Sequence, residues 1–307
     1  MDSFKKCTPE TARPVLTFKK VLQAPGRFVR WMAQSPKCLV GATLLLIIVL
    51  LFVLAPVLAT YDPYELETGE PLSKPCIEHL MGCDSYGRDL FSRILYGGRM
   101  SLGIGLFTVV ISLVIGIGLG LLSGFVGGRV DLIIMRIADI IFSLPVILLA
   151  LCVAAIVMPG IRVVLIALGT VYSAEVTKLV RGVVLSVREK EFVEAAFVTC
   201  ESKLSVAVRY VLPNCLAPII VQASLISSAA ILSEAAISYL GLGIQSPTPS
   251  LGLMLSDGSK YLLRCPFLSI YPGIAIALTV FSINLMGDGL RDIFDPRFEG
   301  KAAKKNK

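Results

Sequence analysis

The sequence predicts an all-α integral membrane protein with about six transmembrane helices. The chain has 307 residues and a mean hydropathy of +0.79, and 17% of its residues are charged, whereas soluble domains carry about 25%. Several uncharged apolar runs are long enough to cross a hydrocarbon core of about 30 Å. The charged segments between these runs agree on one orientation across a membrane. We therefore do not expect a water-soluble core.

Residues 1–37 form a basic amino-terminal segment that we expect in the cytoplasm. The segment carries eight lysines and arginines against Asp2 and Glu10. No small-residue cleavage site follows a short apolar core, so a removable signal peptide is not expected. Residues 38–60 are the predicted first transmembrane helix, because the run Cys38–Ala59 is uncharged and almost entirely apolar.

Residues 61–99 form a predicted extracytoplasmic loop. Between Tyr61 and Gly98 seven acidic residues stand against three basic ones, so the positive-inside rule places this loop opposite the amino-terminal segment. Residues 100–290 are predicted to form a core of five further helices. The expected spans are Ser101–Leu122, Leu132–Val157, Val163–Thr177, Ala217–Leu240 and Ile270–Met286.

Two basic segments test this orientation. The segment Lys178–Leu212 and the chain after Met286 each carry six lysines and arginines, and six alternating spans place both on the cytoplasmic side. Residues 291–307 are thus a predicted cytoplasmic tail, and both termini are expected inside. Loop lysines and arginines also account for the net charge of +7, so nucleic-acid binding is not expected.

Two features of the apolar spans predict how the helices pack. Gly116, Gly120 and Gly124 recur at every fourth residue, and such a stripe of small residues lets another helix approach closely. Pro145 interrupts the third span, and it is expected to kink that helix.

The segment of residues 186–214 lies between two spans on the predicted cytoplasmic side. Ser186 and Glu189 have capping-box spacing, which predicts the start of a helix. Pro213 is expected to separate the second half of the segment from the next span. A short amphipathic helix here would suit docking into a groove on a partner protein. Its apolar face is formed by Phe192, Val193, Ala196 and Phe197.

This segment resembles the coupling motif of ABC-importer permeases, in which EAA is followed by a usual glycine and then by LP. The matching positions are Glu194, Ala195, Ala196, Cys200, Leu212 and Pro213. Four further stretches resemble the second permease of the dipeptide, oligopeptide and nickel importer group: GCDSYGRDLFSR (Gly82–Arg93), MRIADIIFSLP (Met135–Pro145), SYLGLGIQSPTPSLGLML (Ser238–Leu255) and NLMGDGLRDIFDPR (Asn284–Arg297).

The resemblance implies a type I ABC importer permease-like fold in the bacterial cytoplasmic (inner) membrane. It implies a channel-forming subunit that translocates a dipeptide or oligopeptide, or else nickel or a metal chelate. The implied partners are a second homologous permease, two cytoplasmic ATPase subunits and an extracytoplasmic solute-binding protein. The residues implied in ATPase coupling are Glu194, Ala195, Ala196, Phe197, Cys200, Arg209, Leu212 and Pro213.

The sequence departs from the family pattern at two positions. Cys200 replaces the usual glycine, and Tyr210 stands where many members have histidine. Neither change removes the acidic or small residues of the docking helix, so coupling is expected to be retained. The chain has no GxxxxGK[ST] motif and cannot supply a P-loop itself. It is therefore expected to be a transport subunit rather than an enzyme, with no cofactor.

Charged and polar residues within the spans carry further hypotheses. Arg136 with Asp139 and Glu175 with Lys178 have i,i+3 spacing, which favours a neutralising pair on one helix in each case. Glu234 has no basic residue within a turn. For Glu234 and for Asn284, a place in the translocation path and an interhelical hydrogen bond are both open.

The predicted outer loop holds the only histidine of the chain and two of its eight cysteines. Cys76, His79 and Cys83 lie close together, and a disulfide between the two cysteines is favoured over a metal clip, although the sequence does not decide whether it forms. No metal site is predicted. Asp84, Gly87, Arg88 and Asp89 are expected to form a cap that leads into a short outer helix, with Asp89 and Arg93 as an i,i+4 pair.

Two other classes of function are considered. A stand-alone secondary transporter predicts an internal inverted repeat and a midplane cluster of ionisable groups, and the sequence has neither. A membrane enzyme needs an activated nucleophile, but His79, the only histidine, lies in the outer loop. The importer subunit is thus the leading interpretation, and the secondary transporter is the alternative.

Overall fold

The structure, a computed structural model, describes residues 35–198 and 203–294. Within these residues five helices are long and apolar enough to cross a membrane, and a bent pair makes six if it counts as one span. The five are α3 (Pro36–Val53), α5 (Leu90–Val126), α8 (Ile161–Arg188), α11 (Leu212–Tyr239) and α13 (Phe267–Phe294). The bent pair is α6 (Gly128–Ser143) and α7 (Val146–Val157). The prediction of an all-α membrane protein with about six spans is confirmed.

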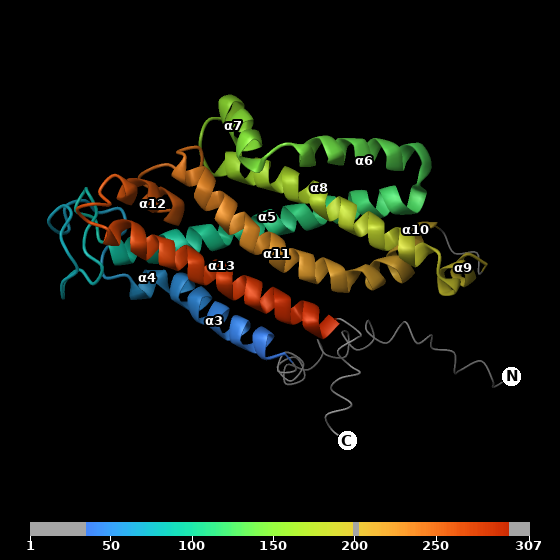
Figure 1. Cartoon of the computed structure of the whole chain (residues 1–307), viewed down its shortest axis with the longest axis horizontal. Helices are drawn as coiled ribbons and strands as arrows, with labels where there is room; N and C mark the ends of the chain where they lie inside the picture. Colours follow the sequence, from blue (N-terminus) through green and yellow to red (C-terminus); the bar gives the residue numbers. More distant parts are fainter. Residues whose placement is uncertain (1–34, 199–202, 295–307) are drawn as a thin grey trace, which may run out of the picture.

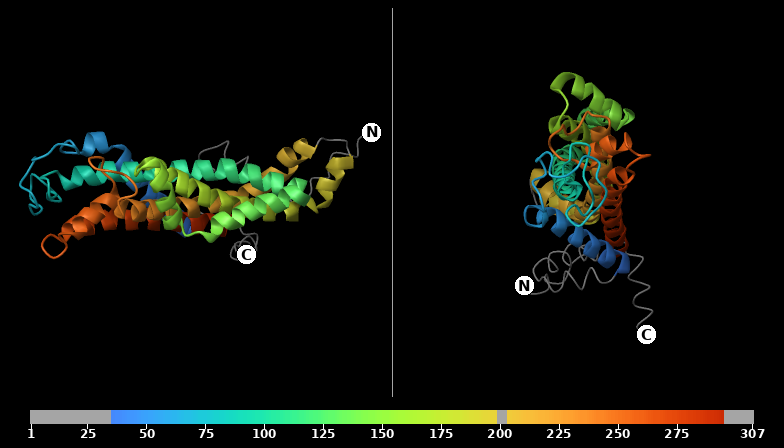
Figure 2. Two further views of the ribbon diagram at one scale, coloured as in Figure 1. Left: turned by 90° about the horizontal axis from the view of Figure 1, so that it is seen from above. Right: turned by 90° about the vertical axis from the view of Figure 1, so that its left-hand side faces the viewer.

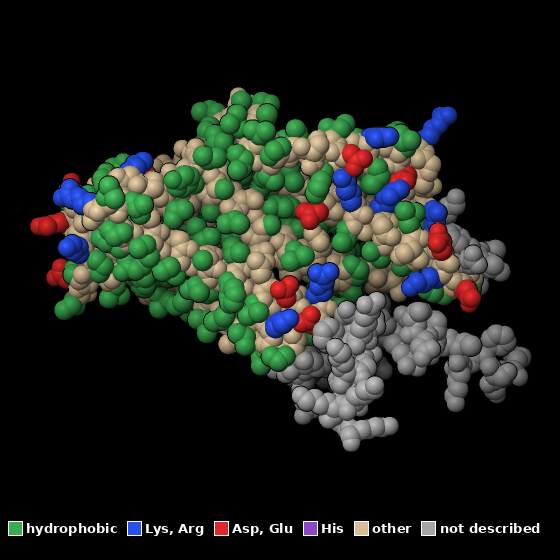
Figure 3. All heavy atoms as spheres, viewed as in Figure 1, with side chains coloured by type: hydrophobic (Ala, Val, Ile, Leu, Met, Phe, Trp, Pro, Cys, Tyr) green, Lys and Arg blue, Asp and Glu red, His purple; other side chains and the backbone are tan. Residues whose placement is uncertain are grey.

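The long helices lie side by side along one axis of an elongated bundle (Figures 1 and 2). One end carries the loop of residues 60–89 with the short helices α4 (Ala55–Leu58) and α12 (Leu251–Ser259). The other end carries α9 (Glu191–Val198) and α10 (Lys203–Val206). Figure 3 shows a broad area of apolar side chains over the bundle, with charged side chains at the end that carries the loop and scattered from the middle toward α9. We call these ends the loop end and the α9 end.

The first and last long helices run antiparallel and meet at their terminal ends. Helix α3 packs along α13, and Lys37 Nζ lies 3.2 Å from Asp292 Oδ2. Gly41 and Gly289 allow this approach, because a Cβ on either would lie within 2.4 Å of the partner helix backbone. The start of α3 and the end of α13 therefore lie on the same side of the bundle. Residues 1–34 and 295–307, with the predicted basic segments, lie outside the described residues.

The glycine stripe on α5 packs against α8, as predicted. A Cβ on Gly116 would lie 2.5 Å from Val176 Cβ, and a Cβ on Gly120 would lie 2.7 Å from Val180 Cβ. Gly124 meets Val184 in the same way, at 2.8 Å. Because a branched side chain of α8 fits into each glycine gap, the two helices are in contact over three turns.

Two helices are longer than the spans predicted from their apolar runs. Helix α5 begins at Leu90, within the predicted loop of residues 61–99 and well before the predicted start of its span at Ser101. Asp89 Oδ2 accepts a hydrogen bond of 2.8 Å from Ser92 N, so the predicted cap is confirmed, but its helix continues into the span. Helix α8 likewise continues beyond the predicted end to Arg188, because helical structure does not stop where the apolar run stops.

The third span is bent more sharply than a proline kink. Helices α6 and α7 meet at an angle of 94° across Leu144 and Pro145. Leu144 is extended, with ψ 129°, as residues before proline prefer to be. Its N–H still bonds to Ile141 O at 3.2 Å. Helix α7 consequently turns away from α6 (Figure 1).

The helix boundaries around residues 186–214 also differ from those predicted. Ser186 lies inside α8, where its hydroxyl bonds to Val183 O, so it does not cap a new helix. Pro213 stands in the first turn of α11 and does not separate it from the preceding π-helical turn, Ala207–Val211. A proline is tolerated there because the first-turn N–H groups need no helical acceptor.

We predict that Gly120→Val destabilises the protein and that Gly118→Val does not. A Cβ at position 120 would lie 2.7 Å from Val180 Cβ and 2.9 Å from Thr177 O, whereas a Cβ at position 118 meets nothing within 4 Å. Overpacking of this kind typically costs about 1–3 kcal/mol. The measurement is the thermal unfolding midpoint of each purified variant in detergent. Equal midpoints for the two variants would contradict the close packing of α5 and α8.

Candidate functional site

Helix α9 is the centre of the predicted coupling site. It follows α8 after a tight turn, in which Lys190 N bonds to Val187 O at 3.1 Å and Val193 N bonds to Lys190 O at 2.9 Å. Val193 and Ala196 are 0% and 6% exposed and belong to the main apolar core of the chain. Ala195 is exposed. Val193 and Ala196 of the predicted docking face thus pack against the chain's own core, whereas the side of α9 with Ala195 is exposed.

The other predicted coupling residues spread along the same end of the bundle. Arg209 is exposed in the π-helical turn, and Leu212 and Pro213 are half-buried at the start of α11. The side chains of Glu194 and Phe197 and the whole of Cys200 lie outside what the structure describes. The backbone therefore brings α9 and the start of α11 to one end.

An ionic latch joins α6 to the part of α8 that leads into α9. Arg181 Nη2 donates to Asp131 Oδ2 at 2.7 Å, and Arg181 Nε donates to the second carboxylate oxygen. Ser123 at the end of α5 donates to the same carboxylate. Arg188 Nη1 adds a bond of 3.2 Å to Gly124 O on α5. We call Asp131, Arg181 and Ser123 the latch.

The i,i+3 pairs predicted within single helices are not the pairs that form. Lys178 Nζ lies 2.9 Å from Asp139 Oδ1 on α6, so Asp139 pairs with Lys178 instead of Arg136. Glu175 accepts a bond of 2.8 Å from Gln222 Nε2 on α11. Lys178 and Glu175 of α8 thus contact residues of neighbouring helices and do not pair with each other.

The carboxylate of Glu234 on α11 accepts hydrogen bonds from three serine hydroxyl groups. Ser101 of α5 donates to Oε2 at 2.8 Å, whereas Ser238 and Ser250 donate to Oε1 at 2.8 and 3.0 Å. The Glu234 residue is 0% exposed. The carboxylate therefore ties α5, α11 and the start of α12 together at the loop end. Asn284 Oδ1 on α13 accepts a bond from Ser228 on α11. A translocation role for either residue stays a prediction.

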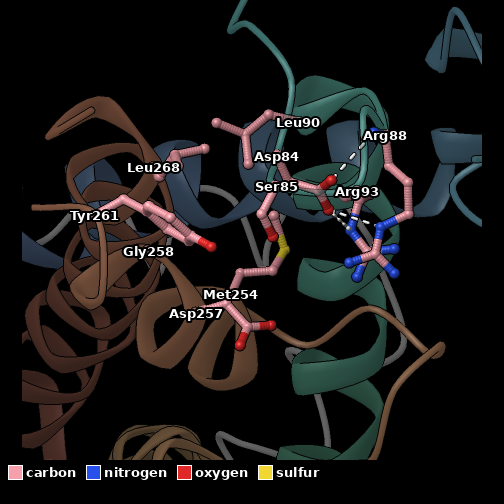
Figure 4. A pocket seen from close by; sticks show the side chains of 10 residues that line it. All are labelled: Asp84, Ser85, Arg88, Leu90, Arg93, Met254, Asp257, Gly258, Tyr261 and Leu268. Carbon is pink, nitrogen blue, oxygen red and sulfur yellow. Dashed lines mark hydrogen bonds and ion pairs between the residues drawn. The ribbon is translucent and has the colours of Figure 1, made fainter. Parts of the chain in front are cut away.

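The loop end is held by a second set of charged groups. Asp84 Oδ2 lies 2.7 Å from Arg88 Nε and 3.5 Å from Arg93 Nε, so Arg93 pairs with Asp84 and not with Asp89 as predicted. In Figure 4 both guanidinium groups lie on the same side of Asp84, and Asp257 and Tyr261 line the small pocket beside it. These contacts hold the loop around Asp84 against the start of α5.

The histidine and cysteines of the loop serve packing. His79 Nδ1 lies 2.9 Å from Asp89 Oδ1, and its ring stacks on Tyr61 at 4.7 Å. Cys76 is an exposed free thiol and Cys83 a buried one, so the disulfide that the sequence left open is not formed. Burial raises the pKa of the Cys83 thiol. Among the residues that the structure describes, no group of His, Cys, Asp and Glu could hold a metal ion.

Comparison with known proteins identifies the family of the chain, and the matches cover nearly its whole length. Residues 116–300 match the family described as binding-protein-dependent transport system inner membrane component. The dipeptide transport system permease protein DppC of Alkalihalophilus pseudofirmus is 39% identical over 293 residues, which cover 95% of this chain and 96% of the relative. The chain belongs to this family.

The permease has further relatives and one solved structure that resembles it. The di/tripeptide transport system permease protein DppC of Pseudomonas aeruginosa is 42% identical over 276 residues, which cover 88% of this chain and 91% of the relative. The inward-facing MetNI methionine ABC transporter has a chain that superposes with a TM-score of 0.53 at 17% identity, and the match covers 66% of the permease and 96% of that chain. The predicted type I importer fold is confirmed.

Family membership settles the class of function. The protein is a multi-pass inner-membrane permease of an ABC importer, and it works with ATPase and binding-protein partners. ATP is hydrolysed by the separate ATPase subunits, so the permease is not an enzyme.

The latch is the part of the site that sequence reasoning missed. Asp131 and Arg181 are fifty residues apart, and nothing in their own surroundings pairs them. The glycine stripe was the one relevant signal in the sequence. Its end, at Ser123 and Gly124, packs α5 against α6 and α8 beside the latch. The permease thus links α5, α6 and α8 where the chain turns into α9.

We predict that Asp131→Ala impairs the permease more than Asp139→Asn. The Asp131 carboxylate receives three hydrogen bonds from two helices, whereas the Asp139 side chain is 56% exposed and has one ion pair. Charge-assisted bonds are worth about 1.5–3 kcal/mol each when they are shielded from water, and exposed pairs much less. Uptake by the complete importer should therefore fall at least about tenfold for Asp131→Ala only.

The charge swap Asp131→Arg with Arg181→Asp provides the matched test. If the latch acts through this pair, the double variant should recover part of the uptake that either single variant loses. Equal uptake by Asp131→Ala and Asp139→Asn would contradict the role given to the latch.

Proposed function

We propose that the chain is the permease subunit of a peptide importer and that α9 is its coupling helix. The observation that carries the proposal is the division of α9 into an anchored side, with Val193 and Ala196 buried in the core, and an open side with Ala195. A helix fixed to its own subunit on one side and open on the other suits transmission of force from a partner.

The peptide cargo is supported by the printed functions of the relatives. The relative from Alkalihalophilus pseudofirmus is a dipeptide permease, that from Pseudomonas aeruginosa a di/tripeptide permease, and a relative from Escherichia coli a probable D,D-dipeptide permease at 40% identity. We infer a di- or oligopeptide as cargo ahead of the nickel or metal chelate that the sequence left open. The solute-binding protein delivers it from outside.

The proposed assembly has one further permease of the same family and two ATPase subunits. Each ATPase binds one coupling helix, so two permeases call for two ATPases. ATP-driven closure of the ATPases moves α9, and α8 carries the motion into the membrane because α9 follows it directly. Only a difference in ATPase contacts between the two states of the permease drives this cycle.

In the proposed orientation the α9 end faces the cytoplasm and the loop end faces outward. The ion pair of Lys37 with Asp292 supports a common side for the two termini. Arg181 and Arg188 lie in the last part of α8, and Arg209 lies in the π-helical turn before α11. These basic residues are at the α9 end, which fits the positive-inside rule.

The coupling role predicts different effects for two neighbouring alanines. Ala195→Trp and Glu194→Ala should reduce uptake at least about tenfold and loosen ATPase association, because a lost charge-assisted bond or an overfilled contact costs about 1–3 kcal/mol. The permease should remain at normal levels in both. Ala196→Trp should also lower the amount of folded permease, because Ala196 is 6% exposed and packs in the core. Cys200→Gly should be tolerated, since glycine accepts any backbone geometry.

The measurement is peptide uptake by the reconstituted importer, with ATPase co-purification as the second readout. Normal transport by Ala195→Trp with the ATPases still bound would show that α9 is not the coupling helix.

The orientation predicts which residues an external reagent reaches. In a chain without its native cysteines, a cysteine at the exposed Glu70 should react with a membrane-impermeant thiol reagent in intact spheroplasts. A cysteine at Lys5 should react only after the membrane is opened. Labelling in the opposite order would reverse the proposed topology.

A further inference from the structure

Glu175 is a carboxylate of the membrane-spanning helix α8, close to the inner end of the predicted span Val163–Thr177. It lies fourteen residues after the start of α8 at Ile161 and thirteen before its end at Arg188, so by the helical rise it is about 20 Å from either end. The residue is half-buried, and Gln222 Nε2 on α11 donates to its Oε1 at 2.8 Å. A carboxylate within a membrane-spanning helix is costly to place against lipid.

The cation nearest in sequence does not neutralise Glu175. Lys178 is one turn away, but its ammonium lies 2.9 Å from Asp139 Oδ1 on α6 and sits over the ring of Phe142. Within the part of the chain that the structure describes, Glu175 has no ion pair; its one bond is the neutral one from Gln222. No lysine or arginine among the described residues neutralises Glu175.

The surroundings of Glu175 are polar along two helices. Helices α8 and α11 are in contact and lie side by side (Figure 1). On the same pair of helices, Tyr172 Oη lies 3.2 Å from Ser233 Oγ. We call Tyr172, Glu175, Gln222 and Ser233 the α8–α11 seam. Glu175 therefore lies against the neutral hydrogen-bonding Gln222 of α11 and not against lipid alone.

The second buried carboxylate of the spans does not offer the same chemistry. Glu234 is 0% exposed, and three serine hydroxyls occupy both of its oxygens. No ligand can reach it without breaking this arrangement. Glu175 keeps Oε2 without a hydrogen-bond donor among the described residues. The two acids thus differ, because both oxygens of Glu234 accept hydrogen bonds and only one oxygen of Glu175 does.

We propose that Glu175 binds the cationic group of the transported solute, the protonated amino terminus of a peptide. The assignment rests on the proposed peptide cargo. Ammonium and carboxylate groups form short charge-assisted hydrogen bonds. Every peptide with a free amino terminus carries this group whatever its side chains are, so a single carboxylate suits a path that accepts varied peptides. Gln222 positions the carboxylate by its bond to Oε1.

The test uses the complete importer in proteoliposomes, with alanyl-alanine as the probe. Glu175→Gln removes the charge but keeps the size of the side chain, and it should reduce uptake at least tenfold with normal subunit assembly. The double variant Glu175→Gln with Gln222→Glu moves the carboxylate across the same hydrogen bond, and it should regain most of the uptake. Wild-type uptake by Glu175→Gln would overturn the assignment.

The nature of the cation is tested by pH. The α-amino group of a peptide loses its proton near pH 8, so the ratio of wild-type uptake to Glu175→Gln uptake should fall between pH 6.5 and 9.5. Effects of pH on the binding protein and ATPases cancel in this ratio. A constant ratio would show that Glu175 does not bind the amine.

Two further outcomes are decisive. If Glu175→Gln loses co-purification with the second permease, the carboxylate forms an ion pair between subunits and the proposal is wrong. If the wild-type importer takes up no alanyl-alanine although ATP turnover responds to its binding protein, the peptide cargo is wrong and this assignment falls with it.

Discussion

The contact between α5 and α8 is the constraint on which the rest of the structure depends. Apolar burial drives little association between helices in lipid, so close packing and interhelical polar contacts must hold the bundle. The glycine stripe of α5 admits Val176, Val180 and Val184 of α8. The latch then adds charge-assisted bonds at the α9 end of the same two helices. A rigid pair results, and α9 is attached directly to one of its members.

This arrangement divides the polar groups of the membrane region by task. Glu234 with its three serines ties α5, α11 and α12 at the loop end, and the latch ties α5, α6 and α8 at the other. Between these two ties, the α8–α11 seam carries Glu175 with a single neutral partner. The two ties thus hold the helices at both ends of the bundle, and Glu175 lies between them.

The sequence predicted those features that depend on local chemistry. The apolar runs, the glycine stripe, the Asp89 cap and the bend at Pro145 all follow from single residues or short periods. It failed where a partner lay on another helix. Lys178 was within one turn of Glu175 but paired with Asp139, and Val193 and Ala196 of the expected docking face were buried by the chain's own core. Such pairings depend on helix crossings that one sequence does not specify.

The most direct test of this account measures whether α9 and α8 move as one body. Spin labels at the exposed residues Glu191 and Arg162, at the start of α9 and the outer end of α8, report one distance within the subunit by double electron–electron resonance. A label at Glu191 and one on the second permease report the opening of the complex. Adding ATP should change the second distance and leave the first unchanged. A shift of the first distance with no change of the second would contradict transmission through α8.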